Sequence, residues 1–319
     1  MGMFGNLFSH NSKGGNPELL LSIERAVSGV EPLLKQISGY PENYRKPVSV
    51  ALEYARSLAA SVPGPLMIDR ESYAKDAFVH VIFPDIDSLT EAICSSLALQ
   101  DYLRDSPAVN ELYALMGMRR FEKSMVGMEL SGQTIQRDVV QKVVYFTSHT
   151  LESPAPSEQQ ARDMAALNFF DSLVGKVKKR VEGRKQEKQS QQLKKDMLMA
   201  RLHTANELDR PALQEELGRM LNGMQATVSS LELSNYVNDF EAVLLNPEQH
   251  LRMDKKTIIM DSMGIRRDAD DISRGVEFMF NELIGYDRRD WSVIMVRCSN
   301  IQGEPFSERL EKAYRKLAI

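Results

Sequence analysis

Cysteine, tryptophan and histidine are scarce in this 319-residue sequence, which contains two, one and five of them respectively. Cys94 and Cys298 lie far apart, and neither belongs to a Cys-x-x-Cys pair or has a histidine at zinc-ligand spacing. We therefore predict two buried structural thiols in place of a disulfide, a metal site or a nucleophile. This cysteine usage is typical of a reducing compartment, so we expect a cytoplasmic protein.

Long apolar runs are also missing. No window approaches the roughly 18 consecutive apolar residues that a membrane-spanning helix needs. The first eight residues lack the basic and apolar regions of a secretory signal, and Asn6 stands where N-myristoylation requires serine or threonine. We therefore expect no membrane span and no secretory signal.

The sequence has no large excess of one charge, because it contains 40 basic and 44 acidic residues and its formal net charge is −4. No global field draws the protein toward nucleic acid or an anionic membrane, so any such attraction has to come from a local patch. Hydrophobic residues make up 43% and charged residues 26% of the chain, which is typical of a globular protein.

Short catalytic motifs are absent too. The sequence contains no P-loop, no Gly-x-Gly-x-x-Gly turn, no Gly-x-Ser-x-Gly elbow and no His-Glu-x-x-His helix. The histidines are scattered, and His149 at the end of a predicted strand is the best of them as a candidate for an active site. We assign no catalytic, cofactor-binding or metal-ligating residue and no cofactor. The sequence leaves enzymatic activity open and favours a protein without it.

The first half of the chain is predicted to contain helices followed by a hairpin. Apolar residues at three- and four-residue steps predict helices beginning near residues 17, 47, 69 and 88, with a break of the first helix around Gly29 and Pro32. Ser106-Pro107 is predicted to open another short helix that continues through Leu115. Alternation over residues 126–130 and a β-branched and aromatic run over 139–146 predict an antiparallel hairpin with a longer loop.

The second half begins with a long predicted helical segment from Ser157. Residues 182–192 lack large apolar side chains, which indicates a solvent-exposed helix or a flexible linker. Helices are predicted over 209–233 and around 236–244, and a last helix around 310–317. Strands are predicted over residues 257–260, 276–280 and 291–298. The hairpins of the two halves share a few residues, and whether this reflects an internal duplication is left open.

These patterns predict an α+β protein that is predominantly helical. We expect helical segments followed by a small antiparallel hairpin or sheet in each half, and a long polar helix or linker between the halves. The expected parts are a flexible N-terminus (1–16), a helical bundle with a hairpin (17–156), a long helix with the polar basic linker 182–192 (157–208), and helices, antiparallel strands and a C-terminal helix (209–319).

A run of basic residues is the most visible local feature, and its members are Lys176, Lys178, Lys179, Arg180, Arg184, Lys185 and Lys188. Such a concentration can neutralise several phosphates of a nucleic-acid backbone. The run lacks the interleaved aromatic side chains that stack on single-stranded bases. A solvated helix between two domains has the same composition, and we interpret the run first in that way, with nucleic-acid or partner contact as the alternative.

An acidic cluster near the C-terminal third is the best candidate for a metal site, and it consists of Asp261, Asp268, Asp270 and Asp271. Hard cations require several oxygen ligands that converge from a tight loop. The spacing does not match an EF-hand, since neither the glycine nor the bidentate glutamate of that loop is present. A charged turn between two strands is the simpler interpretation.

The function that best fits these observations is that of a non-enzymatic scaffold, adaptor or regulator that acts through helical surfaces. Its expected partners are other proteins, or a second copy of the chain paired as a coiled coil through residues 209–233. One alternative is a nucleic-acid-associated protein that uses residues 176–195. A second alternative is an enzyme or metal-binding protein centred on residues 261–271.

Overall fold

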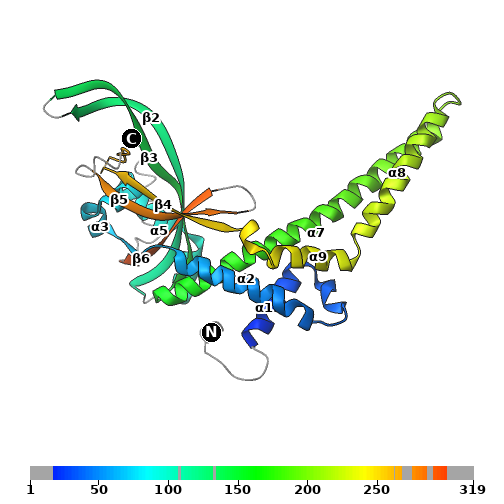
Figure 1. Cartoon of the computed structure of the whole chain (residues 1–319), viewed down its shortest axis with the longest axis horizontal. Coiled ribbons are helices and arrows are strands. Elements are labelled where there is room, and N and C mark those ends of the chain that lie inside the picture. The colour runs from blue at the N-terminus through cyan, green and yellow to red at the C-terminus, as the bar shows by residue number, and fades with distance from the viewer. Residues whose placement is uncertain are drawn as a thin grey trace. The chain divides into compact units, whose positions relative to one another are not determined.

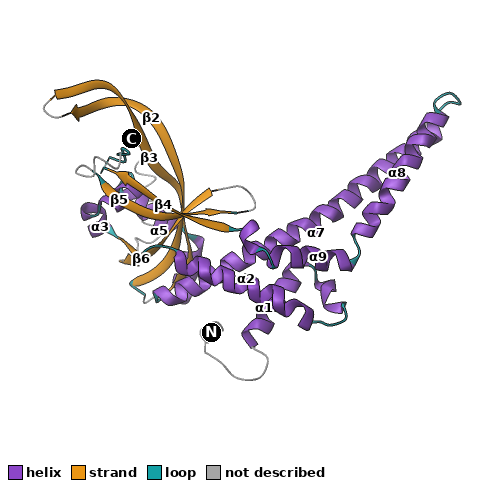
Figure 2. Ribbon diagram, viewed as in Figure 1, coloured by secondary structure: helices purple, strands orange, loops and turns teal. Residues whose placement is uncertain are grey.

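The computed structural model describes residues 17–106, 109–131, 134–261, 263–267, 275–285 and 290–299. The expected flexible N-terminus, the expected helix at 310–317 and the side chains of Asp268, Asp270 and Asp271 lie outside these ranges. The described part is an α+β structure with more helix than strand, which confirms the predicted class (Figures 1 and 2).

The helices of the first third are α1 (Pro17–Val30), α2 (Glu42–Ser61), α3 (Arg70–Lys75), α4 (Ala77–Ile82), α5 (Ile86–Ser95) and α6 (Leu97–Asp105), with a 3₁₀ turn η1 (Pro32–Gln36) after α1. The predicted break near Pro32 is confirmed by η1. Short polar side chains cap the small helices, because Asp69, Asp85 and Ser96 each accept a hydrogen bond from a first-turn backbone N–H.

The later helices are α7 (Glu158–Thr204), α8 (Arg210–Ser230) and α9 (Leu233–Leu244), followed by the 3₁₀ turn η2 (Pro247–Gln249). The polar residues 182–192 are helical and form part of α7. No helix in the part of the chain that the structure describes is long and apolar enough to cross a membrane.

A single six-stranded sheet contains β1 (Leu66–Ile68), β2 (Glu111–Ser131), β3 (Thr134–Ala155), β4 (Arg252–Met260), β5 (Val276–Ile284) and β6 (Asp290–Ser299). The strand order is β3-β2-β6-β5-β4, and all of these neighbours are antiparallel. β1 runs parallel to β6 and pairs with its residues 296–298, whereas β5 pairs with residues 290–293.

The prediction of a separate hairpin or sheet in each half is wrong. β6 is buried over several consecutive residues, so both of its faces are covered, as is typical of a strand in the interior of a sheet. β2 from the first half occupies one edge, and β1 and β5 share the other. The pairing therefore joins segments that are more than 150 residues apart, which local patterns do not reveal.

The predicted short helix from Ser106 through Leu115 is also wrong, because β2 begins at Glu111. Leu112 and Leu115 have helical spacing, but both faces of β2 are covered here, so consecutive residues from Ala114 to Met118 are buried. The predicted strands at 126–130 and 139–146 are confirmed as parts of β2 and β3. β2 ends at Ser131 and β3 begins at Thr134, so the connection between them is shorter than expected.

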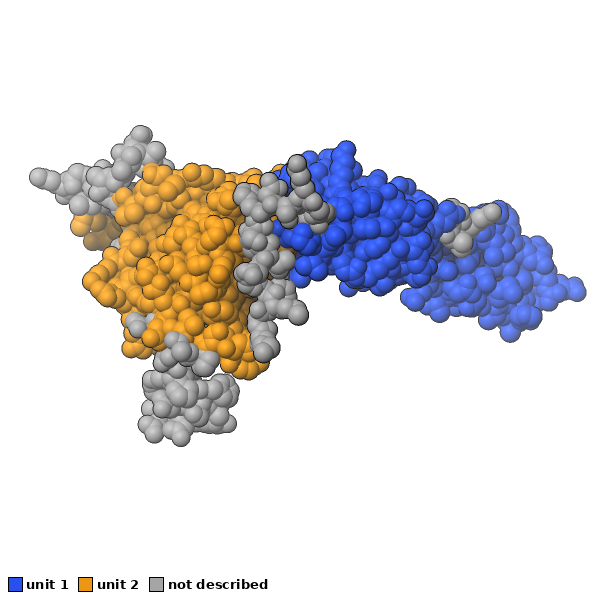
Figure 3. Space-filling view, turned by 90° about the horizontal axis from the view of Figure 1, so that it is seen from below, with its two compact units in different colours: residues 1–55, 169–251 blue, residues 56–168, 252–319 orange. Residues whose placement is uncertain are grey.

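The chain divides into two compact units, each made of two separated segments (Figure 3). Residues 1–55 and 169–251 form a helical unit, and residues 56–168 and 252–319 form the sheet-bearing unit. The ranges 17–156 and 209–319 that the sequence suggested each contribute to both units. The helices α2 and α7 contain residues of both units.

The sheet-bearing unit packs short helices against its sheet. On one face, a single core joins α4, α5 and α6 to the strands, with Phe83, Leu112, Phe146 and Phe280 among its buried members. At the edge of β6, the Met295 N–H donates to the carbonyl of Pro63, which precedes β1, at 2.8 Å. The first turns of α7 attach to the same place, because the Arg162 guanidinium donates to the carbonyls of residues 59 and 62.

The helical unit has its own core where α1, α2, α7 and α9 supply buried aromatic and aliphatic side chains. Tyr44 and Phe240 pack edge to face with ring centroids 5.1 Å apart. Arg25 of α1 forms a two-pronged ion pair with Asp171 of α7. α7 and α8 are joined by residues 205–209 and run antiparallel beside one another (Figure 1).

Candidate interaction surfaces

The basic run is largely engaged within the helical unit. Arg184 pairs with the buried Asp239 of α9 at 2.8 Å, and Arg180 approaches the same carboxylate at 3.8 Å. Lys185 pairs with Glu31, whose side chain is also largely buried. These pairs join α7 to α9 and to the end of α1, so three of the seven predicted contact residues stabilise the helical core.

The other members of the run differ in environment. Lys178 lies 3.9 Å from Glu182 one turn further along α7, and Lys176 and Lys179 also have interactions within the chain. Lys188 is exposed on α7. The pKa of His250 is lowered, mainly by burial and further by the charges of Arg180 and Lys176. Nucleic-acid contact through this run stays a prediction.

Asp261, the described member of the acidic cluster, follows the last residue of β4 and begins a tight turn. One carboxylate oxygen accepts the backbone N–H groups of Met263 and Ile265, both at 3.0 Å. The other oxygen accepts a hydrogen bond from Arg267 at 2.7 Å. In the described ranges, no group of three or more His, Cys, Asp or Glu side chains is arranged to hold a metal ion.

His149 and Cys298 are both packed inside the sheet-bearing unit. Nε2 of His149 lies 3.0 Å from the Ile82 carbonyl, so the neutral ring donates its proton there, and Phe83 lies against the ring. Burial lowers the pKa of His149. Cys298 is fully buried, as predicted, and burial raises the pKa of its thiol to about 12. Cys94 is partly exposed, so the predicted burial is wrong for this residue, and both thiols are free.

The far part of the β2–β3 hairpin is the first surface that sequence analysis did not identify. We call residues 119–131 of β2 and 134–147 of β3 the β-arm. β6 accompanies β2 only as far as Met118, and within the described ranges no strand pairs with that edge of β2 beyond it. The hairpin extends past the other strands of the sheet (Figure 2).

Large apolar side chains are exposed along the β-arm, and they are Phe121, Met125, Val126, Met128, Ile135, Val140 and Tyr145. Val126 and Val140 are cross-strand partners with exposed fractions of 67% and 70%. Phe121 and Tyr145 are also partners, with stacked rings 5.5 Å apart. Because neighbouring residues of a strand point to opposite faces, the β-arm presents apolar groups on both faces.

Ion pairs tie the base of the β-arm to the rest of the sheet. The Arg120 guanidinium donates to one oxygen of Glu282 on β5 at 2.7 and 3.0 Å, and it also pairs with Glu122. Lys256 of β4 lies 3.6 Å from Glu282. The Glu282 side chain is only 12% exposed, so this charge depends on its partners.

The two edges of the β-arm differ. On the β3 side, the Val144 N–H donates to the Gly264 carbonyl and the Arg266 N–H donates to the Lys142 carbonyl, both at 2.8 Å. Gly264 has a φ of +75°, and a β-carbon there would lie 2.6 Å from the Val144 carbonyl oxygen. The chain therefore covers the β3 edge near the base of the arm, whereas the β2 edge has no described strand beside it.

The second surface is the outer part of the α7–α8 pair. We call residues 186–204 of α7 and 210–230 of α8 the helical arm. Leu198 and Leu213 are buried between the helices, whereas Leu193, Met197 and Leu208 are exposed. Two helices alone cannot cover their apolar stripes, because each helix has only one neighbour.

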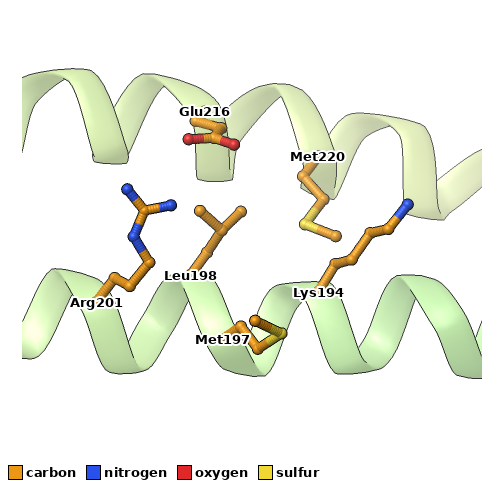
Figure 4. Close-up of a pocket in the computed structure, with 6 residues that line it drawn as sticks. All are labelled: Lys194, Met197, Leu198, Arg201, Glu216 and Met220. Carbon is orange, nitrogen blue, oxygen red and sulfur yellow. The ribbon is translucent and has the colours of Figure 1, made fainter.

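A shallow groove runs along one side of the helical arm. It is lined by Lys194, Met197, Leu198, Arg201, Glu216 and Met220. Figure 4 shows Glu216 of α8 level with Leu198 of α7, while Arg201 and Lys194 lie to either side of that level along α7. The groove thus has an apolar floor, a basic wall on α7 and an acidic group on α8.

No family model, curated protein or solved structure matches this chain. We therefore infer a function from the chemistry of the two arms.

The amino-acid sequence contains only part of the signal for these surfaces. The alternation at residues 126–130 indicated a strand, but nothing local showed that β2 outruns β6. The stripe of α8 was visible in the sequence, whereas the groove depends on which face α7 presents to α8.

Proposed function

We propose that the protein is a non-enzymatic interaction protein, a scaffold or adaptor, which holds an extended segment of a partner protein against the β-arm. The observation that carries this proposal is the open β2 edge beyond Met118 together with apolar side chains on both faces of the arm. An added strand satisfies the free backbone groups of such an edge, and its alternate side chains extend the apolar surface of each face.

The free energy available from covering the exposed side chains of the β-arm supports a binding role over a purely structural one. Covering a large apolar side chain contributes on the order of 1–2 kcal/mol, and seven such side chains are exposed along the arm. The anchored base of the β-arm also favours binding, because the ion pair of Arg120 with Glu282 keeps the hairpin ordered before the partner binds. A preorganised surface loses less conformational entropy on binding.

The side-chain chemistry favours a protein over a nucleic acid. Single-stranded bases stack on exposed aromatic rings, but Phe121 and Tyr145 already stack on each other. The remaining exposed apolar residues of the arm are Met, Val and Ile, which pack against other aliphatic groups. The basic run of α7 lies elsewhere and has ion-pair partners at Arg180, Arg184 and Lys185.

The test compares the parent chain with the double variant V126T/V140T in a crosslinked affinity purification from cells. Threonine keeps the β-branched shape of valine but replaces an apolar methyl with a hydroxyl, so the hairpin is retained while its apolar surface shrinks. The matched control is V276T, which makes the same change at an exposed valine of β5. Each sample is divided into nuclease-treated and untreated halves.

We expect a defined set of proteins that survives nuclease treatment, is lost with V126T/V140T and is retained with V276T. Partners that disappear on nuclease treatment would favour the nucleic-acid alternative. A partner set that is identical for all three chains would show that the β-arm is not the docking surface.

A further inference from the structure

The helical arm carries a second binding feature, which goes beyond the proposed docking of a partner on the β-arm. Lys194, Arg201 and Glu216 line the groove, and within the described residues none of them has an ion-pair partner in its own chain. By contrast, the basic residues nearer the base of α7 are paired with Asp239 and Glu31. Three unpaired charges around an apolar floor indicate a surface that lacks its counterpart.

The charges of the two helices are complementary to each other. Residues 186–204 contain four basic and two acidic residues, whereas residues 205–230 contain four acidic and two basic ones. A surface that has a basic wall on one side and an acidic group on the other is complementary to its own copy when the copy is turned by a two-fold rotation. The second copy is therefore an occupant whose charges fit both walls at once.

The geometry specifies the orientation of the two copies. A two-fold axis parallel to the helices places α7 of one copy over α8 of the other, and every neighbouring pair of helices is then antiparallel. Glu216 of the second copy then lies level with Leu198, between Lys194 and Arg201, because the axis preserves the levels seen in Figure 4. Met197 of one copy then faces Met220 of the other across the apolar floor.

The contact is large enough for a specific dimer. Nineteen helical residues span about 28 Å, and two adjacent helices present a face about 20 Å wide. The two copies together would bury roughly 1,100 Å² of surface, which is just above the size at which specific interfaces begin. We propose that the helical arm binds a second copy of this chain through the groove side and forms an antiparallel four-helix bundle.

The first experiment measures the self-association of the full chain by sedimentation velocity over a range of concentrations. We expect a dimer in the parent chain, which the variant M197Q/M220Q weakens roughly 100-fold because both groove methionines become polar. The matched control is M199Q, which changes an exposed methionine on the same helix. Residue 199 points about 200° away from residue 197, so it lies off the groove.

The second experiment exchanges the charges of the walls. The variant K194E/R201E has two acidic walls, and E216K has two basic walls, so we expect each alone to be largely monomeric. An equimolar mixture of the two should form a heterodimer, because opposite walls face each other again. Far-ultraviolet circular dichroism checks that the helices of each variant remain folded.

A parent chain that stays monomeric up to about 100 µM, or a mixture that gives no heterodimer, would overturn the proposal. A dimer that is weakened equally by M199Q and M197Q/M220Q would place the contact on another face and would also overturn it. The β-arm variant V126T/V140T is expected to dimerise normally, so failure of this proposal is distinguishable from failure of the proposed function.

Discussion

The β-arm and the helical arm both expose apolar side chains, but they are held in different ways. The β-arm is fixed at its base by partly buried ion pairs around Glu282 and by backbone hydrogen bonds with residues 264 and 266. The helical arm depends on one apolar stripe, and its groove charges have no partner in the described part of the same chain. If the two proposals hold, the β-arm is ordered before it binds, whereas the helical arm gains stability when it associates.

The largest expected effect comes from replacing Gly264 with alanine. The positive φ and the 2.6 Å approach to the Val144 carbonyl oxygen force the covering segment away from β3. We expect the free energy of unfolding to fall by about 2–4 kcal/mol. Urea denaturation followed by tryptophan fluorescence measures this directly, since Trp291 lies in the sheet-bearing unit.

The matched control is Gly183→Ala in α7, where a β-carbon meets no other atom within 4 Å. This change is expected to stabilise the helix by about 0.5–1 kcal/mol, because alanine has less backbone freedom in the unfolded chain. Equal effects of the two substitutions would contradict the difference between a tightly covered strand edge and an open helix surface.

The second prediction concerns a substitution that breaks the ion pairs at the base of the β-arm. Arg120→Met removes the two hydrogen bonds to the largely buried Glu282 and leaves that carboxylate with Lys256 alone. We expect a loss of about 2–3 kcal/mol, because removing one partner leaves a poorly solvated charge. Hydrogen exchange should rise over residues 119–131 more than over residues 291–298.

Arg219→Met serves as the control for Arg120→Met. Arg219 forms only an exposed pair with Glu215 at 3.9 Å on α8, and such pairs contribute little. An unfolding free energy that changes by the same amount in both variants would show that the β-arm is not anchored by this network.

The sequence predicted the elements of this fold better than their assembly. The start of α3 was predicted near Asp69, whose side chain accepts a hydrogen bond from the first turn of the helix. The start of α5 was predicted near residue 88, whereas the helix begins at Ile86 with Asp85 as its cap. Strands β4, β5 and β6 were predicted because their residues alternate or are uniformly apolar. The single sheet was missed, since the pairing of β2 with β6 joins residues 111–118 to residues 292–299.

The candidate surfaces show the same division between local and non-local information. The basic run was visible in the composition, but its partners Glu31 and Asp239 lie far from it in sequence. The β-arm could not be predicted from the sequence, because its open edge is defined by the point at which β6 stops pairing with β2. The stripe of α8 was recognised, although its role as one wall of a groove required the position of α7.

The third prediction concerns Leu198, which is buried between the two helices of the helical arm. Leu198→Ala is expected to cost about 2 kcal/mol, at the lower end for a buried leucine, since a two-helix arm relaxes into the space. The loss should appear as faster hydrogen exchange in residues 186–230 and should diminish at high protein concentration if the arm dimerises.

Leu193→Ala is the control, because this leucine is 65% exposed on the same helix. Its effect on stability should stay below about 0.5 kcal/mol. A Leu198→Ala variant that loosens the β-arm instead would show that the two arms are not stabilised separately.

The smallest expected effect is the acid sensitivity of the sheet-bearing unit. Burial lowers the pKa of His149 below the ordinary value of 6.5, so the unfolded chain binds this proton more readily than the folded one. Stability is therefore fully present above pH 6.5 and falls as the pH drops below that value, with a slope of at most about 1.4 kcal/mol per pH unit. The pKa of His250 in the helical unit is lowered too, but this histidine is less buried, so solvent screening reduces its effect on stability.

Urea denaturation at several pH values between 5 and 8 should show a weaker pH dependence of stability for His149→Gln than for the parent chain. The pH dependence of His250→Gln should be closer to that of the parent chain. If His250→Gln removes more of the pH dependence of stability than His149→Gln does, the helical unit and not the sheet-bearing unit is the more acid-sensitive part of the molecule.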